Sequence, residues 1–218
     1  MGLLKDTDIK FLKEKFGKEL GKEVTVIAFT SENQNKENND TFKDILTEVS
    51  DLDERIKLEF YSEEDKELVE KYGITMYPAF AMVGEKDYGV RFYGIPSGYE
   101  FAALIENLID ISKDKSALAT DLLEEVKSID KEITIKVFVT PTCPHCPGAA
   151  RKAHMFAMEN ENILGEAIEA NEFPVVSQKY GVMAVPKIVI ESKDGKSVSF
   201  EGNYPEAHFI EKIKELMK

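Results

Sequence analysis

An internal repeat restricts the fold of this chain more than any other feature of its sequence. Residues 71–78 (KYGITMYP) return as residues 179–186 (KYGVMAVP), with every position displaced by 108. Further upstream, the apolar residues 24–29 align with residues 133–138 at a displacement of 109. Self-similarity that extends over half the chain predicts two copies of one structural unit.

Both copies predict the same order of elements. A leading amphipathic helix is expected over residues 7–20 and again over residues 117–128, where apolar residues recur with a helical period. A strand, a helix, a short strand and a helix that ends at Tyr-Gly follow, since glycine is a common helix stop. Two strands joined by a turn and a last helix complete each copy. This order predicts an α/β protein of two tandem thioredoxin-fold units, each a central mixed sheet flanked by helices.

The two units are predicted to cover residues 1–115 and 116–218. Their junction is the short polar stretch 111–116 (ISKDKS). With 218 residues in the chain, each unit has roughly the size of an ordinary domain. A junction this short predicts units that are docked on each other, because it leaves little freedom for loose tethering.

Composition narrows the classes of function. A formal net charge of −13, without any basic run, argues against a nucleic-acid partner. No stretch approaches the roughly 18 apolar residues of a membrane span, so no membrane partner is expected. Residues 1–6 (MGLLKD) become charged at once and do not resemble a signal peptide, which predicts an unprocessed, cytoplasmic protein. The 32% of charged residues and the absence of tryptophan suit a thermophile.

The two cysteines of the chain carry its clearest chemical signal. Cys143 and Cys146 stand in residues 140–147 (TPTCPHCP), between an apolar run over 133–139 and a helix expected over 148–158. A C-x-x-C pair on a strand-to-helix turn is typical of a dithiol redox site. In a cytosolic chain such a pair is more often catalytic or metal-binding than structural. The sequence therefore predicts an enzyme, a dithiol–disulfide oxidoreductase with no metal and no cofactor beyond the redox-active disulfide.

Thiol chemistry assigns different roles to the two cysteines. Exchange requires a thiolate, and a free cysteine, with a pKa of about 8.5, is mostly protonated at neutral pH. A position at the helix N-terminus, a protonated His145 and a hydrogen bond from Cys146 would each favour the thiolate of Cys143. We expect Cys143 to be the exposed attacking thiol and Cys146 the buried resolving thiol. Pro144 suits the start of the helix, where no N–H donor is required.

Several stretches in both copies match one known family. They are residues 3–4 (LL), 87–91 (DYGVR), 94–101 (GIPSGYEF), 137–144 (VFVTPTCP) and 182–190 (VMAVPKIVI). In these stretches the chain resembles the glutaredoxin-like protein disulfide oxidoreductases of hyperthermophiles, which have two fused thioredoxin-fold units.

The resemblance implies a substrate-binding role for the second half of the repeat. Pro186 would be a cis-proline against the disulfide, and Val185 would offer its backbone to a substrate chain as an added strand. From the sequence alone, a trans proline in a loop remains an alternative.

The resemblance also bears on the redox poise. The pair Pro144-His145 is found between the cysteines of DsbA, whereas glutaredoxins usually have Pro-Tyr. A histidine that stabilises the thiolate favours the dithiol form, so the disulfide is expected to be more oxidising than that of thioredoxin. Residue 137, where thioredoxins place a buried acid, is a valine.

The chain departs from that family in its first unit. Many members have a C-x-x-C in each unit, but the positions 108 residues before Cys143 and Cys146 are Asn35 and Asn38. Asparagine cannot exchange thiols, so the first unit is expected to be redox-silent, and two-site activities such as disulfide isomerisation are put in doubt. The asparagine-rich segment 31–40 is expected to be a solvated surface loop.

The resemblance implies partners and leaves rival functions. Protein disulfides would be the substrates, and a thioredoxin reductase-like flavoprotein or small thiols would be the reductant, as part of cell redox homeostasis. One alternative is electron transport to a peroxidase such as a peroxiredoxin, because some bacterial alkyl hydroperoxide reductase flavoproteins begin with two thioredoxin units and one C-x-x-C. Others are a metal or iron–sulfur site, for which two thiols form half a ligand set, and a redox-inert binding module.

Overall fold

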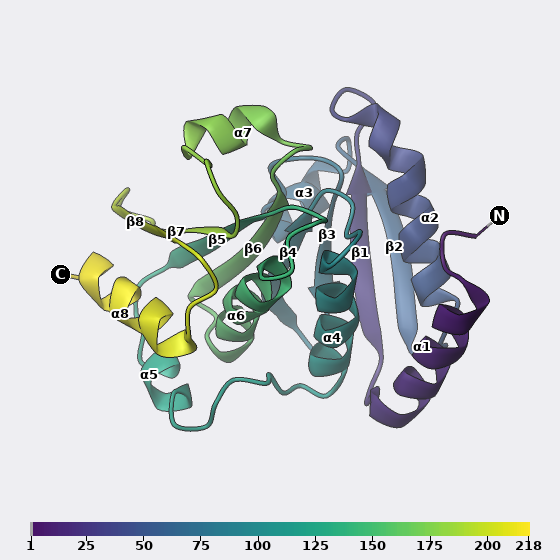
Figure 1. Cartoon of the computed structure of the whole chain (residues 1–218), viewed down its shortest axis with the longest axis horizontal. Coiled ribbons are helices and arrows are strands. Elements are labelled where there is room, and N and C mark those ends of the chain that lie inside the picture. Colours follow the sequence, from purple (N-terminus) through teal and green to yellow (C-terminus); the bar gives the residue numbers. More distant parts are fainter. Residues whose placement is uncertain (1) are drawn as a thin grey trace.

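The computed structural model describes residues 2–218 (Figure 1). Met1, the first residue of the predicted first unit, lies outside the described residues. The elements of the first half are α1 (Asp6–Glu19), β1 (Val24–Thr30), the 3₁₀ turn η1 (Lys36–Asn38), α2 (Asn39–Ser50), β2 (Ile56–Ser62), α3 (Lys66–Tyr72), β3 (Ala79–Val83), β4 (Asp87–Tyr93) and α4 (Glu100–Ser112). Those of the second half are α5 (Leu123–Lys127), β5 (Ile133–Val139), α6 (Cys146–Glu159), β6 (Ile163–Glu169), α7 (Pro174–Lys179), β7 (Lys187–Ser192), β8 (Ser197–Glu201) and α8 (Glu206–Leu216).

The two halves follow the predicted order and build one continuous sheet of eight strands. Its strand order is β2-β1-β3-β4-β6-β5-β7-β8. In each half one pair is parallel, β1 with β2 and β5 with β6, and the other pairs are antiparallel. This mixed sheet confirms the predicted fold class, while the boundary after residue 115 remains a prediction.

The halves join through strands β4 and β6, which pair in parallel over Val90–Tyr93 and Gly165–Ile168. The short junction predicts only that the units are docked, whereas the structure pairs the edge strands of both halves in one backbone ladder. The chain ends lie at opposite ends of the molecule (Figure 1).

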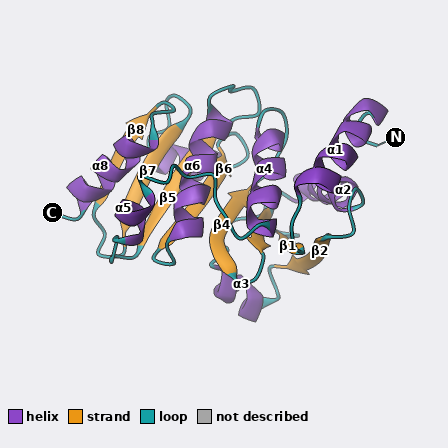
Figure 2. Cartoon of the chain, turned by 90° about the horizontal axis from the view of Figure 1, so that it is seen from below, coloured by secondary structure: helices purple, strands orange, loops and turns teal. Residues whose placement is uncertain are grey.

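The sheet separates two hydrophobic cores. Helices α1, α2, α4, α5, α6 and α8 contribute to the core on one face, opposite α3 (Figure 2). Helices α3 and α7 contribute to the second core. Helix α6 lies very close to the sheet because its buried face is built from alanines: a Cβ atom at Gly165 of β6 would lie 2.8 Å from the carbonyl carbon of Ala153. Small residues at this crossing bring the first turn of α6 against the end of β5.

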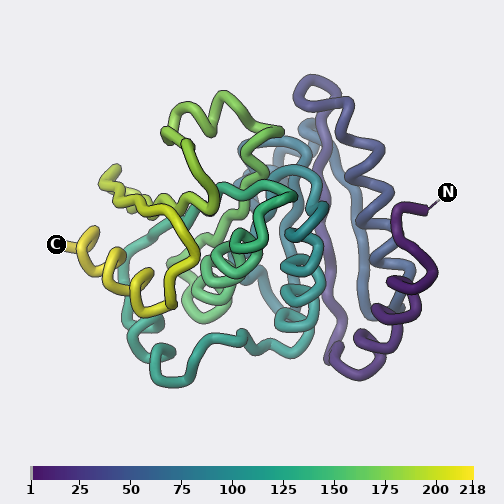
Figure 3. Tube along the Cα trace, viewed as in Figure 1, coloured from purple at the N-terminus to yellow at the C-terminus, as the bar shows by residue number. Residues whose placement is uncertain are grey.

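The leading helix of the second half is shorter than predicted. The expected helix over residues 117–128 is reduced to Leu123–Lys127, and the residues before it form an irregular connection (Figure 3). The hydroxyl of Ser116 accepts the N–H of Leu118 at 3.2 Å, a local turn bond within this connection. An irregular chain also covers more distance per residue than a helix, as the path from α4 to β5 requires. Within residues 2–218, no helix has both the length and the apolar character of a membrane span.

Candidate functional site

The two cysteines form a disulfide at the point where β5 leads into α6. Their Cα atoms are 5.5 Å apart. Cys143 retains 9% of its surface exposure and Cys146 none, which confirms the predicted difference in burial. The difference arises because Cys146 is the first residue of α6 and faces the core, whereas Cys143 belongs to the turn before the helix.

Helix α6 begins later in the chain than the argument for a stabilised thiolate at Cys143 assumed. His145 is the N-cap and Cys146 the first helical residue, so Cys143 precedes the helix instead of occupying its first turn. The N–H of Cys143 donates to the carbonyl of Thr140 at 3.1 Å, which forms a turn of its own. The prediction that Pro144 starts the helix was therefore wrong, and Pro147, which lacks an N–H and has a fixed φ, occupies the first turn. The disulfide nevertheless holds the sulfur of Cys143 beside this helix end.

The repeated proline comes to lie beside the disulfide. The Val185–Pro186 peptide bond is cis, as the family resemblance implied. The Sγ atom of Cys143 lies 3.7 Å from the carbonyl oxygen of Val185. The structure therefore brings together Cys143, Cys146, Val185 and Pro186, and their catalytic and binding roles remain predictions.

Two apolar side chains belong to the segments around this site and were not singled out from the sequence. Met183, two residues before Val185, is 90% exposed, and Val175 on α7 is 79% exposed. Large exposed apolar side chains are typical of interaction surfaces when they gather near one place. No hydrophobic period marks them, because Val175 lies on the six-residue helix α7 and Met183 on the loop that follows it.

The first unit forms part of the wall behind the dithiol turn. The N–H of Tyr99 donates to the carbonyl of Pro141, two residues before Cys143, at 2.9 Å. Gly98 has a φ of +60°, and a Cβ atom there would lie 2.8 Å from the carbonyl carbon and 2.9 Å from the Cβ of Pro141. The turn that carries Cys143 is therefore built against a segment of the first unit.

Comparisons with known proteins agree with this geometry. The family model for the thioredoxin domain matches residues 133–215. The solved structure of a protein disulfide oxidoreductase from Aeropyrum pernix K1 is 32% identical in sequence. Its superposition covers 96% of this chain and 92% of that chain, with a TM-score of 0.85. The chain belongs to the protein disulfide oxidoreductase family.

Other similar proteins include one solved structure of comparable length and several longer curated relatives. The structure of the alkylhydroperoxide reductase AhpF from Enterococcus faecalis is 25% identical, covers 95% of this chain and 98% of that chain, and gives a TM-score of 0.85. A protein named NADH dehydrogenase from Bacillus subtilis is 30% identical over 156 residues, which are 71% of this chain and 29% of that protein. The chain spans between 20% and 30% of the length of the curated relatives of this kind.

Gly98→Ala is expected to destabilise the fold and displace the dithiol turn. An alanine at positive φ costs about 1–2 kcal/mol, and contact with Pro141 adds to that cost. Gly73→Ala is the matched control, since Gly73 has a φ of +64° and nothing within 4 Å of a Cβ atom. Urea unfolding should show a clearly larger loss for Gly98→Ala. Equal losses would show that Pro141 does not press on this position.

A buried carboxylate at the start of α4 escaped the sequence-based prediction. Glu100 follows Tyr99, is 1% exposed, and neither of its oxygens has a hydrogen-bond partner among residues 2–218. Burial alone raises the pKa of Glu100 to about 8. Its one visible signal in the sequence is an acid directly before the apolar residues of α4. Perturbed carboxyl groups of this kind concentrate at functional sites.

A second buried titratable group, His154 of α6, connects the two units. Its Nε2 atom lies 3.1 Å from the carbonyl oxygen of Arg91, and its Nδ1 atom lies 2.7 Å from the amide of Asn107. Burial lowers the pKa of His154 to about 4, so the ring is neutral at pH 7. A neutral ring with its proton on Nε2 satisfies both contacts, which explains how a histidine is accommodated at this interface.

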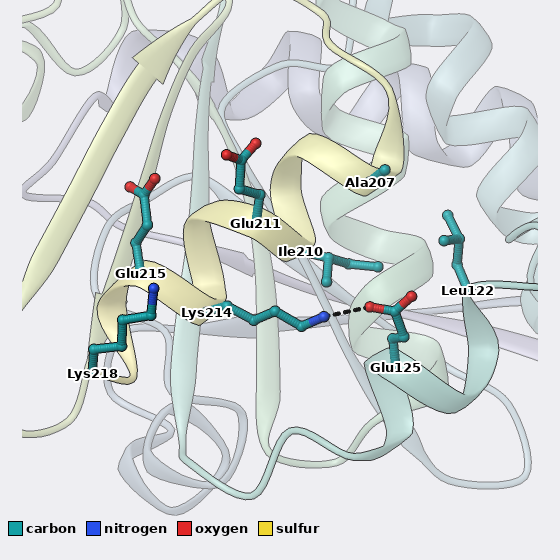
Figure 4. Close-up of a pocket in the computed structure, with 8 residues that line it drawn as sticks. All are labelled: Leu122, Glu125, Ala207, Ile210, Glu211, Lys214, Glu215 and Lys218. Atoms are coloured by element: carbon teal, nitrogen blue, oxygen red, sulfur yellow. Dashed lines mark hydrogen bonds and ion pairs between the residues drawn. The ribbon is translucent and has the colours of Figure 1, made fainter.

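A cavity between α5 and α8 lies away from the dithiol. Its volume is about 350 Å³, and among its lining residues Lys214 reaches Glu125 at 2.5 Å (Figure 4). None of its lining residues belongs to the dithiol turn or to the cis-proline segment. Within residues 2–218, no group of three or more histidine, cysteine, aspartate or glutamate side chains is arranged to hold a metal ion.

Proposed function

We propose that this protein exchanges the Cys143–Cys146 dithiol or disulfide with disulfides or dithiols of other proteins. The observation that carries the proposal is the sulfur of Cys143, a residue that keeps 9% of its exposure, disulfide-bonded to the fully buried Cys146 and 3.7 Å from the carbonyl oxygen of Val185. A thiol that attacks a substrate needs access, and its resolving partner needs protection from that substrate. Only the first cysteine has access here.

The exchange proceeds in two balanced steps. In the reductive direction the thiolate of Cys143 attacks one sulfur of the substrate disulfide, whose S–S bond breaks, and the departing sulfur takes up a proton. Cys146 then loses its proton and attacks the sulfur of Cys143, which releases the second substrate thiol. The substrate gains two electrons and two protons, and the protein is left with the Cys143–Cys146 disulfide. The oxidative direction is the reverse.

The cis-proline segment would hold the substrate chain during this reaction. Val185 is half-buried, and its backbone lies beside the reacting sulfur, where an extended peptide could pair with it. The exposed Met183 would then contact apolar side chains on that peptide. Protein disulfides next to aliphatic or aromatic residues are the substrate class that this surface suits.

The supply of electrons is the next part of the proposal. A thioredoxin reductase-like flavoprotein or small thiols would reduce the disulfide in the cytoplasm, and the dithiol would serve as the only redox group. The likeness to the alkylhydroperoxide reductase AhpF favours a second candidate function, in which the dithiol passes electrons to a peroxiredoxin.

Two assays run side by side test these functions. The chain is supplied with dithiothreitol, and the reduction of insulin disulfides is compared with the reduction of an oxidised peroxiredoxin. Faster turnover of insulin supports general disulfide exchange, and faster turnover of the peroxiredoxin supports the carrier function. If neither disulfide is reduced faster than by dithiothreitol alone, both functions are rejected.

The reduction potential of the disulfide is expected to lie above that of thioredoxin, about −270 mV. His145 is exposed at the N-cap of α6, beside the sulfurs, where a positive charge stabilises the thiolate and therefore the reduced form. Equilibration with glutathione buffers, followed by alkylation and mass spectrometry, measures the potential, and His145→Tyr should lower it. A wild-type value at or below about −270 mV would contradict the role of His145.

A further inference from the structure

The position that replaces the attacking cysteine in the first unit has a bonding partner of its own. The side-chain amide of Asn35 donates to the carbonyl oxygen of Tyr77 at 3.0 Å. Tyr77 precedes cis-Pro78, as Val185 precedes cis-Pro186. Asn35 therefore occupies the position of Cys143 relative to its own cis-proline. Its amide is hydrogen-bonded to the carbonyl of Tyr77, whereas the corresponding carbonyl of the second unit, that of Val185, stays available beside the sulfur. The expectation of a solvated loop was wrong at this residue.

The same asparagines bind the second unit. The amide of Asn35 also donates to the carbonyl oxygen of Glu172 at 3.2 Å, and the amide of Asn38 donates to the carboxylate of Glu172 at 2.7 Å. The other oxygen of that carboxylate accepts the N–H of Ile95 at 2.8 Å. A segment between β6 and α7 is thus held by three donors from the first unit.

The topology explains why this segment reaches the first unit. β1 runs parallel to β4, through β3, and β4 runs parallel to β6, so β1 and β6 end at the same edge of the sheet. The segment after β6 is pressed against Gly94, where a Cβ atom would lie 2.8 Å from the Cβ of Glu169. The segment is also tied to the strand that leads to the dithiol, because Ala170 donates its N–H to Val139 at 2.8 Å.

We propose that the first unit retains a binding site where its dithiol would be, and that its ligand is the segment 169–173 of the second unit. Asn35 and Asn38 are the recognition groups, and Glu172 is the group they recognise. The site is therefore closed to protein substrates, and it fixes the second unit on the first. This proposal goes beyond disulfide exchange and does not depend on it.

The electrostatics of Glu172 agree with this arrangement. Burial raises the pKa of its carboxyl group, and the neighbouring Glu169 raises it further, whereas the bonds from Ile95 and Asn38 lower it. A half-buried carboxylate beside another acid requires donors, since an unpaired buried acceptor is costly. Both donors to the carboxylate come from the first unit, which gives a physical reason for asparagine at position 38, while Asn35 bonds the backbone carbonyl of the same residue.

Hydrogen exchange on the full chain at pH 8 tests whether Asn35 and Asn38 hold the segment 169–173. Asn38→Asp replaces the donor with a carboxylate that repels Glu172, and Asn35→Gly removes the amide while keeping a residue that tolerates its φ of +45°. In both variants the amides of residues 169–173 should exchange at least about tenfold faster, and in Asn38→Asp the amide of Ile95 as well. The control is Gln34→Glu, which makes the same change of charge as Asn38→Asp at an exposed neighbouring residue. It should leave these exchange rates unchanged.

Asn35→Gly introduces no charge, so it still tests the proposal if Asn38→Asp fails to fold. Rates in Asn35→Gly equal to those in Gln34→Glu would overturn the proposal. A second measurement concerns substrate access: a disulfide peptide trapped on Cys146→Ser should protect residues 183–187 from exchange and leave residues 75–79 unprotected. Protection of both segments would show that the first unit binds substrate and would overturn the closed site. Failure to trap any peptide would count against disulfide exchange, while the variant exchange rates would still decide this proposal.

Discussion

Cys143→Ser is expected to lower the rate of disulfide exchange by at least about 10³-fold, which corresponds to about 4 kcal/mol of activation free energy. A serine hydroxyl is a far weaker nucleophile than a thiolate, and Cys146 cannot substitute for the missing sulfur because it is fully buried. The fold should persist, since the exchange of sulfur for oxygen at residue 143 changes little volume. Insulin reduction and urea unfolding, measured on the same preparation, separate the two effects.

Cys146→Ser is the matched partner of this experiment and should behave differently. Cys143 can still attack a substrate disulfide, but no thiol remains to resolve the mixed disulfide. We therefore expect a covalent adduct in non-reducing mass spectrometry for Cys146→Ser and none for Cys143→Ser. An adduct that forms on Cys143→Ser instead would reverse the roles of the two cysteines, and equal activity of Cys143→Ser and wild type would reject disulfide exchange.

Most of the fold prediction came from the internal repeat of the sequence. Because KYGITMYP and KYGVMAVP recur at a fixed displacement, the order of the elements after them could be predicted, and β3 (Ala79–Val83) directly follows the first copy. The parallel pairing of β4 with β6 could not be predicted, since it depends on which sheet edges remain free once both units have folded. The cis bond before Pro186 came from the family resemblance, because an X-Pro pair alone does not determine its isomer.

The first unit shows where a single sequence is insufficient. Asn35 and Asn38 were paired with the cysteines by their displacement of 108 residues, but the composition of their segment predicted solvation. Their partner, Glu172, lies more than 130 positions away in the chain and becomes a neighbour only through the shared sheet. Hydrogen bonds over such separations leave no local pattern, whereas helix and strand periods do.

Glu100→Gln is expected to stabilise the protein strongly at alkaline pH and to flatten the dependence of its stability on pH. Burial raises the pKa of Glu100 to about 8 in the folded chain, compared with 4.5 for an ordinary glutamate. Since the folded state then binds the proton more tightly than the unfolded state, the free energy of unfolding falls as pH rises from about 4.5 and levels off above about 8. At 1.36 kcal/mol for each pKa unit, the whole loss is of the order of 5 kcal/mol.

Urea unfolding between pH 4 and pH 9 measures this effect directly. Near pH 4 the carboxyl group of Glu100 is protonated in the wild type, and the glutamine of the variant carries no charge. The two proteins should therefore have similar stability. At pH 9 the variant should be more stable by several kcal/mol, because the wild type must either ionise a carboxyl group that has no partner among residues 2–218 or admit water to it. Glu67→Gln is the control, since Glu67 also lies in the first turn of a helix but is exposed. A constant difference between Glu100→Gln and wild type across this range would mean that Glu100 ionises as it does in water, and hence that the wall behind the dithiol turn is open to solvent.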